Sequence, residues 1–308
     1  MFGNGGRSLS EPFPSYVCGK MARSIIVTGG SGFIGSKVCV KLASEGWLVH
    51  AWMRGKTRMD TLDVSGHVER RQIDIYDEAK VREALRETGA KDMIHLAWGG
   101  LPNYLSCHHI DTELVQQIRF VRNAVENGIE RLTQTGTCFE YGARDGELHE
   151  DMDCHPTNPY GYAKLALQRY LTFLSQEIPF SHRWLRLFYM YGEGQGEKSL
   201  YTLLRAAYER GDTSFDMSAG HQIRDFLPID EVVDRIAALH AADVADGIYN
   251  VCSGQPVSVR QLVEHWIADW NYDVHLNLAK FPIPSYEPLA FWGSGLKAAT
   301  ALKGSKRA

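Results

Sequence analysis

The segment Asn158-Pro-Tyr-Gly-Tyr-Ala-Lys164 holds the residue types best suited to moving a proton. Asn158 is a favourable helix N-cap and Pro159 suits the first helical position, so a helix is expected from here through Gln176. Tyr160 and Lys164 are four residues apart and should share one helix face. The ammonium is expected to stabilise the phenolate and lower the tyrosine pKa from about 10, which gives an acid or base usable near neutral pH. On its own, this spacing is more typical of an ordinary helix start, so the elements around it must decide.

A glycine-rich turn follows the first predicted strand, Ser24–Thr28. The sequence Gly29-Gly-Ser-Gly-Phe-Ile-Gly35 leads into an amphipathic helix that is expected to run to about Glu45. Glycines at this spacing let the backbone approach a pyrophosphate, whose charge is stabilised at the helix N-terminus. A plain tight turn is the alternative, but the position after a strand favours dinucleotide binding. The residues expected to contact the cofactor are Gly29, Gly32, Phe33, Ile34 and Gly35.

The end of the second predicted strand, Leu48–Met53, bears on the choice of cofactor. An NAD site normally has an acidic residue here for the ribose 2′-hydroxyl, and this sequence has none. Arg54, helped by Lys56 or Arg58, would attract a 2′-phosphate instead. The sequence therefore favours NADP(H), with NAD(H) possible and a solvated basic loop as the structural alternative.

Strands and helices alternate along the first part of the chain, which predicts a parallel, doubly wound α/β sheet of the Rossmann type. The predicted strands are Ser24–Thr28, Leu48–Met53, Val68–Ile75, Asp92–Ala97, Arg131–Gly136 and Arg183–Phe188. Asp74 and Ile75 end the third strand, where a carboxylate can meet the adenine amino group or simply cap a loop. The loop Trp98–His109 is too long for a simple connection and is expected to shape a substrate pocket. Thr137 ends the fifth strand, where its hydroxyl could face the crevice.

The expected organisation is one large domain with a smaller C-terminal lobe. Residues 1–20 form a disordered extension rich in Gly, Ser and Pro, so that either Met1 or Met21 could be the original start. Residues 21–188 form the dinucleotide-binding domain. Residues 189–308 mainly form a substrate-binding lobe, in which strict alternation of strands and helices loosens.

Composition excludes several classes of function. The formal net charge is −4 with mixed signs throughout, so no basic field points to a nucleic acid or a membrane surface. The six cysteines are scattered without Cys-x-x-Cys spacing, which argues for reduced thiols, against a metal site and for a cytoplasmic protein. No apolar run reaches the roughly 20 residues of a membrane span, and no signal peptide is evident.

In combination these motifs resemble the extended short-chain dehydrogenase/reductase family, which contains nucleotide-sugar epimerases, dehydratases and reductases. The resemblance covers about residues 25–270, and its motifs are Thr28-Gly-Gly-Ser-Gly-Phe-Ile-Gly35, Asp74-Ile75, His95-Leu-Ala97, Thr137, Tyr160-x-x-x-Lys164, Tyr191-Gly192 and Arg224-Asp225-Phe226. It implies that Tyr160 is the acid/base, that Lys164 holds the nicotinamide ribose, and that Thr137 binds the reacting sugar oxygen. It also implies cofactor contacts from Leu96, Ala97, Tyr160, Lys164 and Phe188, and a homodimer formed through the two helices that include the Tyr160 segment.

Departures from the family pattern narrow the reaction. The family's 4,6-dehydratases have Asp-Glu after the catalytic Thr and its decarboxylases keep the Glu, whereas this chain has Cys138-Phe139, which argues against both eliminations. Glu140 comes one position late and should lie on the opposite face of an extended segment. Glu113 stands where the family commonly has an Asn, so the local packing or proton relay of the family is not assured here. Tyr189 stands where the family commonly has another Asn, which suggests an altered sugar pocket.

The leading hypothesis is NADPH-dependent reduction at C4 of a nucleotide-linked 4-keto-6-deoxyhexose, such as dTDP-4-keto-6-deoxyglucose, with Tyr160 as general acid. The stretches that start at Gly99, Phe188 and Tyr286 look like those of bacterial 4-ketoreductases. A 4-epimerase with tightly held NAD uses the same three residues and is the runner-up. A non-catalytic nicotinamide sensor is the third reading, but this chain keeps both the tyrosine and the lysine. The residues expected to contact the nucleotide diphosphate sugar are Trp98, Asn103, Thr137, Tyr189 and Arg224, with Arg224 either gripping the diphosphate or forming a buried pair with Asp225.

Overall fold

The computed structural model describes residues 23–55, 66–282 and 288–305. The predicted extension over residues 1–20, Met21, Lys56 and Arg58 lie outside these ranges, as does Tyr286.

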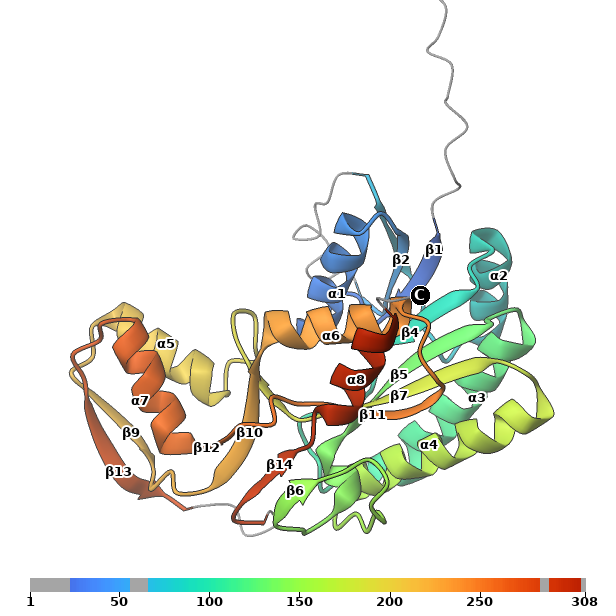
Figure 1. The fold of residues 1–308 in the computed structure, drawn as a ribbon. Helices are drawn as coiled ribbons and strands as arrows, with labels where there is room; N and C mark the ends of the chain where they lie inside the picture. The colour runs from blue at the N-terminus through green and yellow to red at the C-terminus, as the bar shows by residue number, and fades with distance from the viewer. Residues whose placement is uncertain (1–22, 56–65, 283–287, 306–308) are drawn as a thin grey trace, which may run out of the picture.

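A seven-stranded parallel sheet forms the centre of the molecule, in the order β11-β7-β5-β4-β1-β2-β3 (Figure 1). Its strands are β1 (Ser24–Thr28), β2 (Leu48–Met53), β3 (Val68–Gln72), β4 (Asp92–His95), β5 (Arg131–Thr137), β7 (Ser181–Leu187) and β11 (Gly247–Val251). The predicted doubly wound Rossmann-type sheet is thus confirmed. β4 stops two residues before the predicted Ala97 because the backbone N–H groups of Leu96 and Ala97 turn to donate to the Thr28 hydroxyl, both at 3.2 Å.

Helices cover both faces of this sheet, and one apolar core lies under each layer. α1 (Phe33–Ser44), α6 (Ile229–Ala241) and α8 (Leu296–Ser305) pack on one face, and α2 (Glu78–Thr88), α3 (Leu114–Glu126) and α4 (Pro159–Glu177) pack on the other. Because the sheet is covered on both sides, its central strands are apolar along nearly their whole length, as in Ile25, Ile26 and Val27 of β1. None of the helices in the described ranges is both long and apolar enough to cross a bilayer.

Two short turns of non-standard helix stand at the edge of the sheet where the strands end. η2 is a π-helical turn (His109–Glu113) that leads into α3, and η3 is a 3-10 turn (Cys138–Tyr141) that follows β5 directly. The sequence predicts an extended segment at Glu140, so that local prediction is wrong. Both turns pack against α4.

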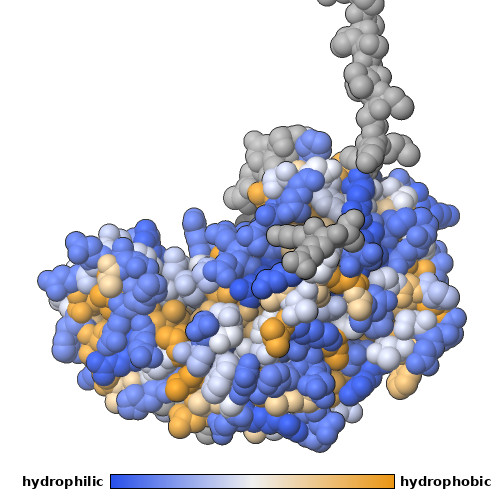
Figure 2. Space-filling view, in the orientation of Figure 1, coloured by the Kyte–Doolittle hydropathy of each residue, from blue (hydrophilic) through white to orange (hydrophobic). Residues whose placement is uncertain are grey.

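The C-terminal third adds a lobe with its own apolar core, drawn on the left of Figure 1. The elements of this core are α5 (Leu200–Arg210), β9 (Ser214–Ser218), α7 (Val259–Asp269) and β13 (His275–Phe281). Shorter strands join the lobe to the sheet, namely β6 (Gly146–Leu148), β8 (Tyr189–Tyr191), β10 (Ile223–Pro228), β12 (Pro256–Ser258) and β14 (Phe291–Gly293). The surface in Figure 2 is largely hydrophilic, with scattered apolar residues. The predicted division at residue 188 remains a prediction.

Candidate active site

The start of α4 has the geometry that its sequence predicts. The Asn158 side chain accepts a hydrogen bond from the Gly161 N–H at 2.8 Å, and Pro159 occupies the first turn. The helix buries one face, which includes Tyr160, Ala163 and Lys164. Both functional side chains of the predicted pair therefore point into the molecule.

Lys164 is enclosed at the carboxyl end of β5. Its Nζ donates to the carbonyl of Thr135 at 2.9 Å and lies 3.9 Å from the centre of the Trp98 ring. A cation above an indole face is attracted to it, which partly offsets the loss of water. Burial nevertheless lowers the pKa of Lys164 to about 7, with Glu140 and then Glu113 opposing the shift by their negative charge.

The predicted lowering of the Tyr160 pKa is wrong for this structure. Burial raises the pKa of Tyr160 above its ordinary value, and the charges of neighbouring Tyr104, Glu140 and Cys138 act in the same direction. The Lys164 ammonium, 5.8 Å from the centre of the Tyr160 ring, is turned to Thr135 and Trp98. Helical spacing placed the two residues on one face, but enclosure from water decides which form of the phenol is favoured.

Aromatic side chains from two other segments enclose Tyr160. The loop after β4 contributes Trp98, Tyr104 and His109, whose ring centres lie 5.9, 5.4 and 5.2 Å from that of Tyr160. η3 contributes Phe139 at 6.4 Å, edge-on. The sequence predicted that this loop shapes the pocket, but only its Trp98 and Asn103 were named, so Tyr104, His109 and Phe139 were missed.

Thr137 stands at the junction of β5 and η3. Its hydroxyl accepts from the Phe139 N–H at 3.3 Å, and its own N–H donates to Glu140 Oε1 at 2.8 Å. These two bonds form a capping box that fixes the first turn of η3. A Cβ on Gly161 would lie 2.6 Å from the Phe139 carbonyl oxygen, so this turn touches α4 beside Tyr160. The predicted role of the Thr137 hydroxyl toward a sugar oxygen stays a prediction.

A cavity of about 250 Å³ begins at the glycine turn and runs past the ends of β2, β3 and β4. Seven predicted cofactor residues line it, namely Gly29, Gly32, Arg54, Asp74, Ile75, Leu96 and Ala97. Gly29 has a φ of +69°, and a Cβ on Gly35 would lie 2.1 Å from the Gly29 carbonyl oxygen, so these two positions require glycine. Phe33 and Ile34 open α1, where backbone N–H groups lack partners within the helix. The residues therefore fit a dinucleotide, whereas Phe188 packs in a separate cluster with Tyr141 and Phe291.

A buried hydrogen-bond network lies beneath this cavity. His95 Nδ1 lies 2.5 Å from the Thr28 hydroxyl and its Nε2 lies 2.5 Å from Gln117 Oε1. Gln117 then donates to Glu113 Oε1 at 2.9 Å. Burial lowers the pKa of His95 to about 4, so the imidazole is neutral.

Glu113 ties the network to the cavity wall. Its Oε1 accepts from the Tyr76 hydroxyl at 2.5 Å and from the Gly99 N–H at 2.7 Å. Burial alone would raise the pKa of Glu113, but these hydrogen bonds hold it below its ordinary value. The sequence marked Glu113 as a departure from the family's common Asn. In the structure its carboxylate accepts three hydrogen bonds, from Tyr76, Gly99 and Gln117, and so joins the loops that carry Tyr76 and Gly99.

The predicted substrate residues lie on two sides of the site. Tyr189 lies between Phe139 and Phe291, with ring centres 6.5 and 6.0 Å away. Arg224 is buried over the Phe291 ring at 4.5 Å and donates to the carbonyls of Ile223 and Leu289. Its backbone carbonyl partners hold the guanidinium at the edge of an aromatic row that leads back to Phe139. Asn103 is exposed on the loop, where its carbonyl accepts from His109.

Asp225 is held by main-chain donors. Its carboxylate accepts from the N–H groups of Ser253, Gly254 and Gly293 at 2.6, 2.8 and 3.3 Å. This arrangement ties β10 to the loop after β11.

Comparison with known proteins shows which family the chain belongs to. The family model described as the NAD dependent epimerase/dehydratase family matches residues 25–252, and the chain belongs to that family. The protein is therefore an enzyme of this family, as the resemblance of its motifs to the extended short-chain dehydrogenases/reductases implied.

The sequences of named relatives align with most of this chain, at low sequence identity. The dTDP-6-deoxy-L-talose 4-dehydrogenase (NAD(+)) of Aggregatibacter actinomycetemcomitans is 28% identical over 88% of this chain and 99% of its own. The dTDP-4-dehydro-6-deoxyglucose reductase of Escherichia coli is 24% identical over 78% of this chain and 79% of its own. Among solved structures, MoeE5 in complex with UDP-glucuronic acid and NAD is 25% identical, with a TM-score of 0.77 over 91% of this chain and 92% of that one.

Proposed function

We propose that the protein reduces the C4 ketone of a nucleotide-linked 4-keto-6-deoxyhexose with NADPH. The observation that carries the proposal is the enclosure of Tyr160 by aromatic side chains, with Phe139 at the place where a dehydratase of the family has its glutamate. Such a pocket offers a proton donor and apolar walls, and Cys138 and Phe139 stand at the two positions where the family's dehydratases carry the carboxyl groups for elimination.

The chain's own residues have separate tasks in this reaction. Bound NADPH supplies the hydride. Tyr160 donates its phenolic proton to the oxygen that develops negative charge, and Thr137 donates a hydrogen bond to the same oxygen. Lys164, held by Thr135, supplies positive charge at the nicotinamide ribose and re-stabilises the phenolate that donation leaves behind.

Two relatives support this choice of substrate. One is named as a 4-dehydrogenase of a dTDP-6-deoxyhexose, and the other as a reductase of a dTDP-4-dehydro-6-deoxyhexose. A 4-dehydrogenase and a 4-ketoreductase catalyse one reaction in opposite directions, so both names describe hydride transfer at C4. The runner-up is a nucleotide-sugar 4-epimerase with tightly held NAD, which the same three residues could serve.

NADP(H) is the favoured cofactor because Arg54 lines the cavity and no acidic residue follows β2 directly. NAD(H) remains the alternative, since NAD stands in the name of one relative and in the names of several matching solved complexes. The proposal has four further parts. Arg224 binds the diphosphate of the substrate, and the residues from 189 onward mainly form the substrate-binding lobe. The protein is a homodimer and is located in the cytoplasm.

The test is NADPH oxidation by purified enzyme with a panel of nucleotide-linked 4-ketohexoses and their C4 alcohols. We expect turnover of a 4-keto-6-deoxyhexose, and a fall of about 10²- to 10⁴-fold in kcat for Tyr160→Phe because the proton donor is lost. Tyr162→Phe, two positions away and exposed, serves as the matched control and should keep full activity. Conversion of a UDP-hexose to its C4 epimer without added nucleotide would refute the reductase, and absence of any turnover would favour the sensor.

A further inference from the structure

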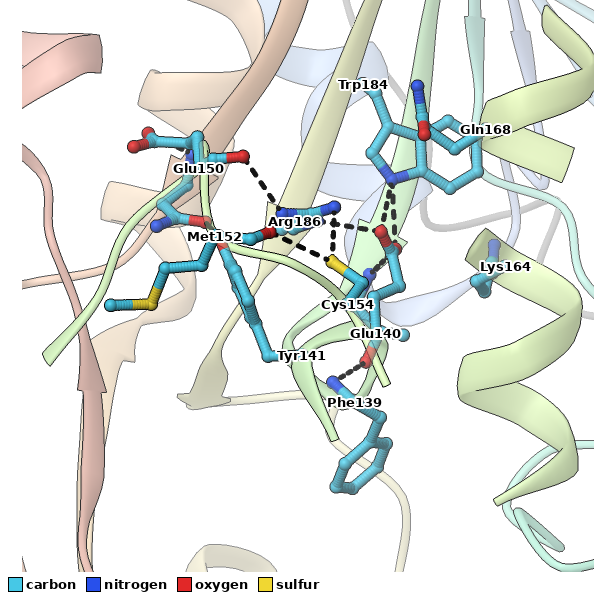
Figure 3. Close-up of polar contacts among 12 residues, drawn as sticks. Phe139, Glu140, Tyr141, Glu150, Met152, Cys154, Lys164, Gln168, Trp184 and Arg186 are labelled. Carbon is cyan, nitrogen blue, oxygen red and sulfur yellow. Dashed lines mark hydrogen bonds and ion pairs between the residues drawn. The ribbon is translucent and has the colours of Figure 1, made fainter. Parts of the chain in front are cut away.

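A fully buried ion pair lies behind the turn η3, and the proposed mechanism does not use it. Arg186 Nε donates to Glu140 Oε2 at 2.8 Å, and the Trp184 Nε1–H reaches both carboxylate oxygens at 2.9 and 3.1 Å (Figure 3). Glu140 has no exposed surface. The sequence placed Glu140 on the opposite face of an extended segment, but the segment is a 3-10 turn that folds the carboxylate back under β5.

Gly136 of β5 leaves room for the Glu140 carboxylate because it has no side chain. A Cβ on Gly136 would lie 2.3 Å from Glu140 Oε1 and 2.1 Å from Trp184 Nε1. A side chain at position 136 would therefore displace both groups. The glycine in β5 is required by the contact between Glu140 and Trp184.

Arg186 is itself fixed on several sides. Its Nη2 donates to Cys154 Sγ at 3.0 Å, and its guanidinium lies 4.4 Å from the centre of the Tyr141 ring. Figure 3 shows Arg186 with contacts drawn to both Glu140 and Cys154. Removing two charges from water is costly, and a buried pair of this kind is often no more stabilising than apolar residues of similar volume.

Two links join Glu140 to the active site. Oε1 accepts from the Thr137 N–H at 2.8 Å, and this bond closes the capping box at the start of η3. The same turn presents the Phe139 carbonyl to α4 at Gly161, next to Tyr160. A shift of the carboxylate would therefore move the turn that contacts both Thr137 and the catalytic helix.

The second link is electrostatic. The Glu140 charge is the largest influence that opposes the effect of burial on the pKa of Lys164, ahead of Glu113. Figure 3 shows Lys164 in the same close-up as Glu140, with no direct contact drawn between the two side chains. Since the ammonium is buried, a fixed anion nearby acts with little screening by water.

We propose that Glu140 is a positioning residue of this active site. Held by Arg186 and Trp184, its carboxylate fixes the turn that carries Thr137. Its negative charge favours the ammonium form of Lys164 over the neutral amine. The inference rests on the proposed function for the roles of Thr137 and Lys164, but its charge component can be measured without substrate or cofactor.

The first measurement is the ionisation of Lys164 in cofactor-free protein labelled with ¹³C-lysine, with the resonance assigned by its loss in Lys164→Arg. The wild-type midpoint is expected at a pH of about 7. In Glu140→Gln it should fall by about one pH unit or more, because the opposing anion is gone. Glu147→Gln, an exposed change on β6, should leave it unaltered. A midpoint within about 0.3 pH unit of wild type in folded Glu140→Gln would overturn the proposal.

If Glu140→Gln does not fold, Glu140→Gln/Arg186→Gln replaces it and is compared with Arg186→Gln alone, which removes the same cation. The Lys164 midpoint should be lower in the double variant than in Arg186→Gln, and equal midpoints would overturn the proposal. Glu140→Asp separates the two components. It keeps the charge but shortens the reach to the Thr137 N–H, so the Lys164 midpoint should stay near that of wild type while kcat falls.

The second measurement is the pH profile of the ketosugar reduction. In Glu140→Gln we expect kcat at pH 7 to fall at least about tenfold with KM for the sugar changed less than about threefold, since the groups affected act on the developing charge. The alkaline limb should move to lower pH, because Lys164 loses its proton earlier as pH rises. An unchanged profile would contradict the proposal. If the wild-type enzyme reduces no ketosugar, the proposed function fails, and the Lys164 titration still decides the inference.

Discussion

At the scale of single residues, the candidate active site holds a phenol whose pKa is raised beside an amine whose pKa is about 7. Burial causes both effects, because it disfavours the charged form of each group. The neutral phenol is the form that can donate a proton to an oxygen, which suits Tyr160 to act as general acid in a reduction. The pKa of Lys164 is about 7 even with Glu140 and Glu113 opposing the effect of burial, so the ammonium form is lost progressively above that pH.

Arg54 provides the residue-scale prediction. Arg54→Ala should raise the Kd for NADPH at least about tenfold, or about 1.4 kcal/mol, and leave the Kd for NADH nearly unchanged, since only NADPH carries the 2′-phosphate. Fluorescence titration of both cofactors against both proteins measures this. Arg82→Ala, an exposed arginine on α2, is the control and should change neither Kd. Tighter binding of NADH than of NADPH to the wild type would refute the preference.

At the scale of elements, the first turn of α4 positions Tyr160, the proposed proton donor. The cap from Asn158 fixes where the helix begins, and contact of the Phe139 carbonyl with Gly161 fixes how closely η3 approaches it. A helix that frayed here would move Tyr160 before any other functional side chain. The cap therefore affects both stability and the reaction.

Asn158→Ala should lower the free energy of unfolding by about 1 kcal/mol, because the Gly161 N–H loses its acceptor. It should also lower kcat. Ser258→Ala removes the cap of α7 in the smaller lobe and is the matched control, with a similar loss of stability and unchanged kcat. Urea unfolding with steady-state kinetics separates the two effects. Equal kcat in both variants would show that the cap does not position Tyr160.

Local patterns predicted most of the regular elements, and distant contacts explain what they missed. The glycine turn before α1 and the Asn158 cap of α4 depend only on neighbouring residues, and the structure confirms both predictions. Glu140 depends on Arg186 and Trp184, which are 46 and 44 residues further along the chain. Likewise, the aromatic rings that enclose Tyr160 come from two other segments, so its pKa shift could not follow from the spacing to Lys164.

At the scale of the whole molecule, neutral histidines stand buried on both faces of the sheet. His95 lies between Thr28 and Gln117, and His240 lies with Nδ1 2.8 Å from the Thr133 hydroxyl and Nε2 3.3 Å from Asp92. Burial lowers the pKa of both imidazoles, to about 4 for His95. Each must be protonated in the unfolded chain at mildly acidic pH while it stays neutral in the folded protein.

Stability should therefore fall as pH decreases from about 6.5 toward 4, because the unfolded state then binds more protons than the folded state. His95 alone should cost about 2 kcal/mol at pH 5 relative to pH 7.5. Urea unfolding at a series of pH values measures this. His95→Gln should be less stable at pH 7.5 but show a shallower decline. An equal decline in the variant and in the wild type would exclude His95 as its source.

The face formed by α3 and α4 leads to a prediction about assembly. The two helices lie side by side (Figure 1), and Arg122 joins them through two hydrogen bonds to Glu177, at 3.0 and 2.8 Å. On these helices Val115, Tyr162 and Phe173 are 42, 52 and 66% exposed, although all three are large apolar side chains. A second copy of the chain that packed its own α3 and α4 there would bury them in an isologous contact.

We expect a dimer in solution by light scattering, and Phe173→Glu should shift it to monomer because a charge would be buried in an apolar contact. Leu203→Glu, at a side chain 47% exposed on α5, is the control and should leave the dimer intact. Because α4 also carries Tyr160 and Lys164, a monomeric variant should lose part of its kcat as its catalytic helix loses a packing partner. A monomeric wild type would refute the assembly, whereas a dimer that persists in Phe173→Glu would place the interface on another face.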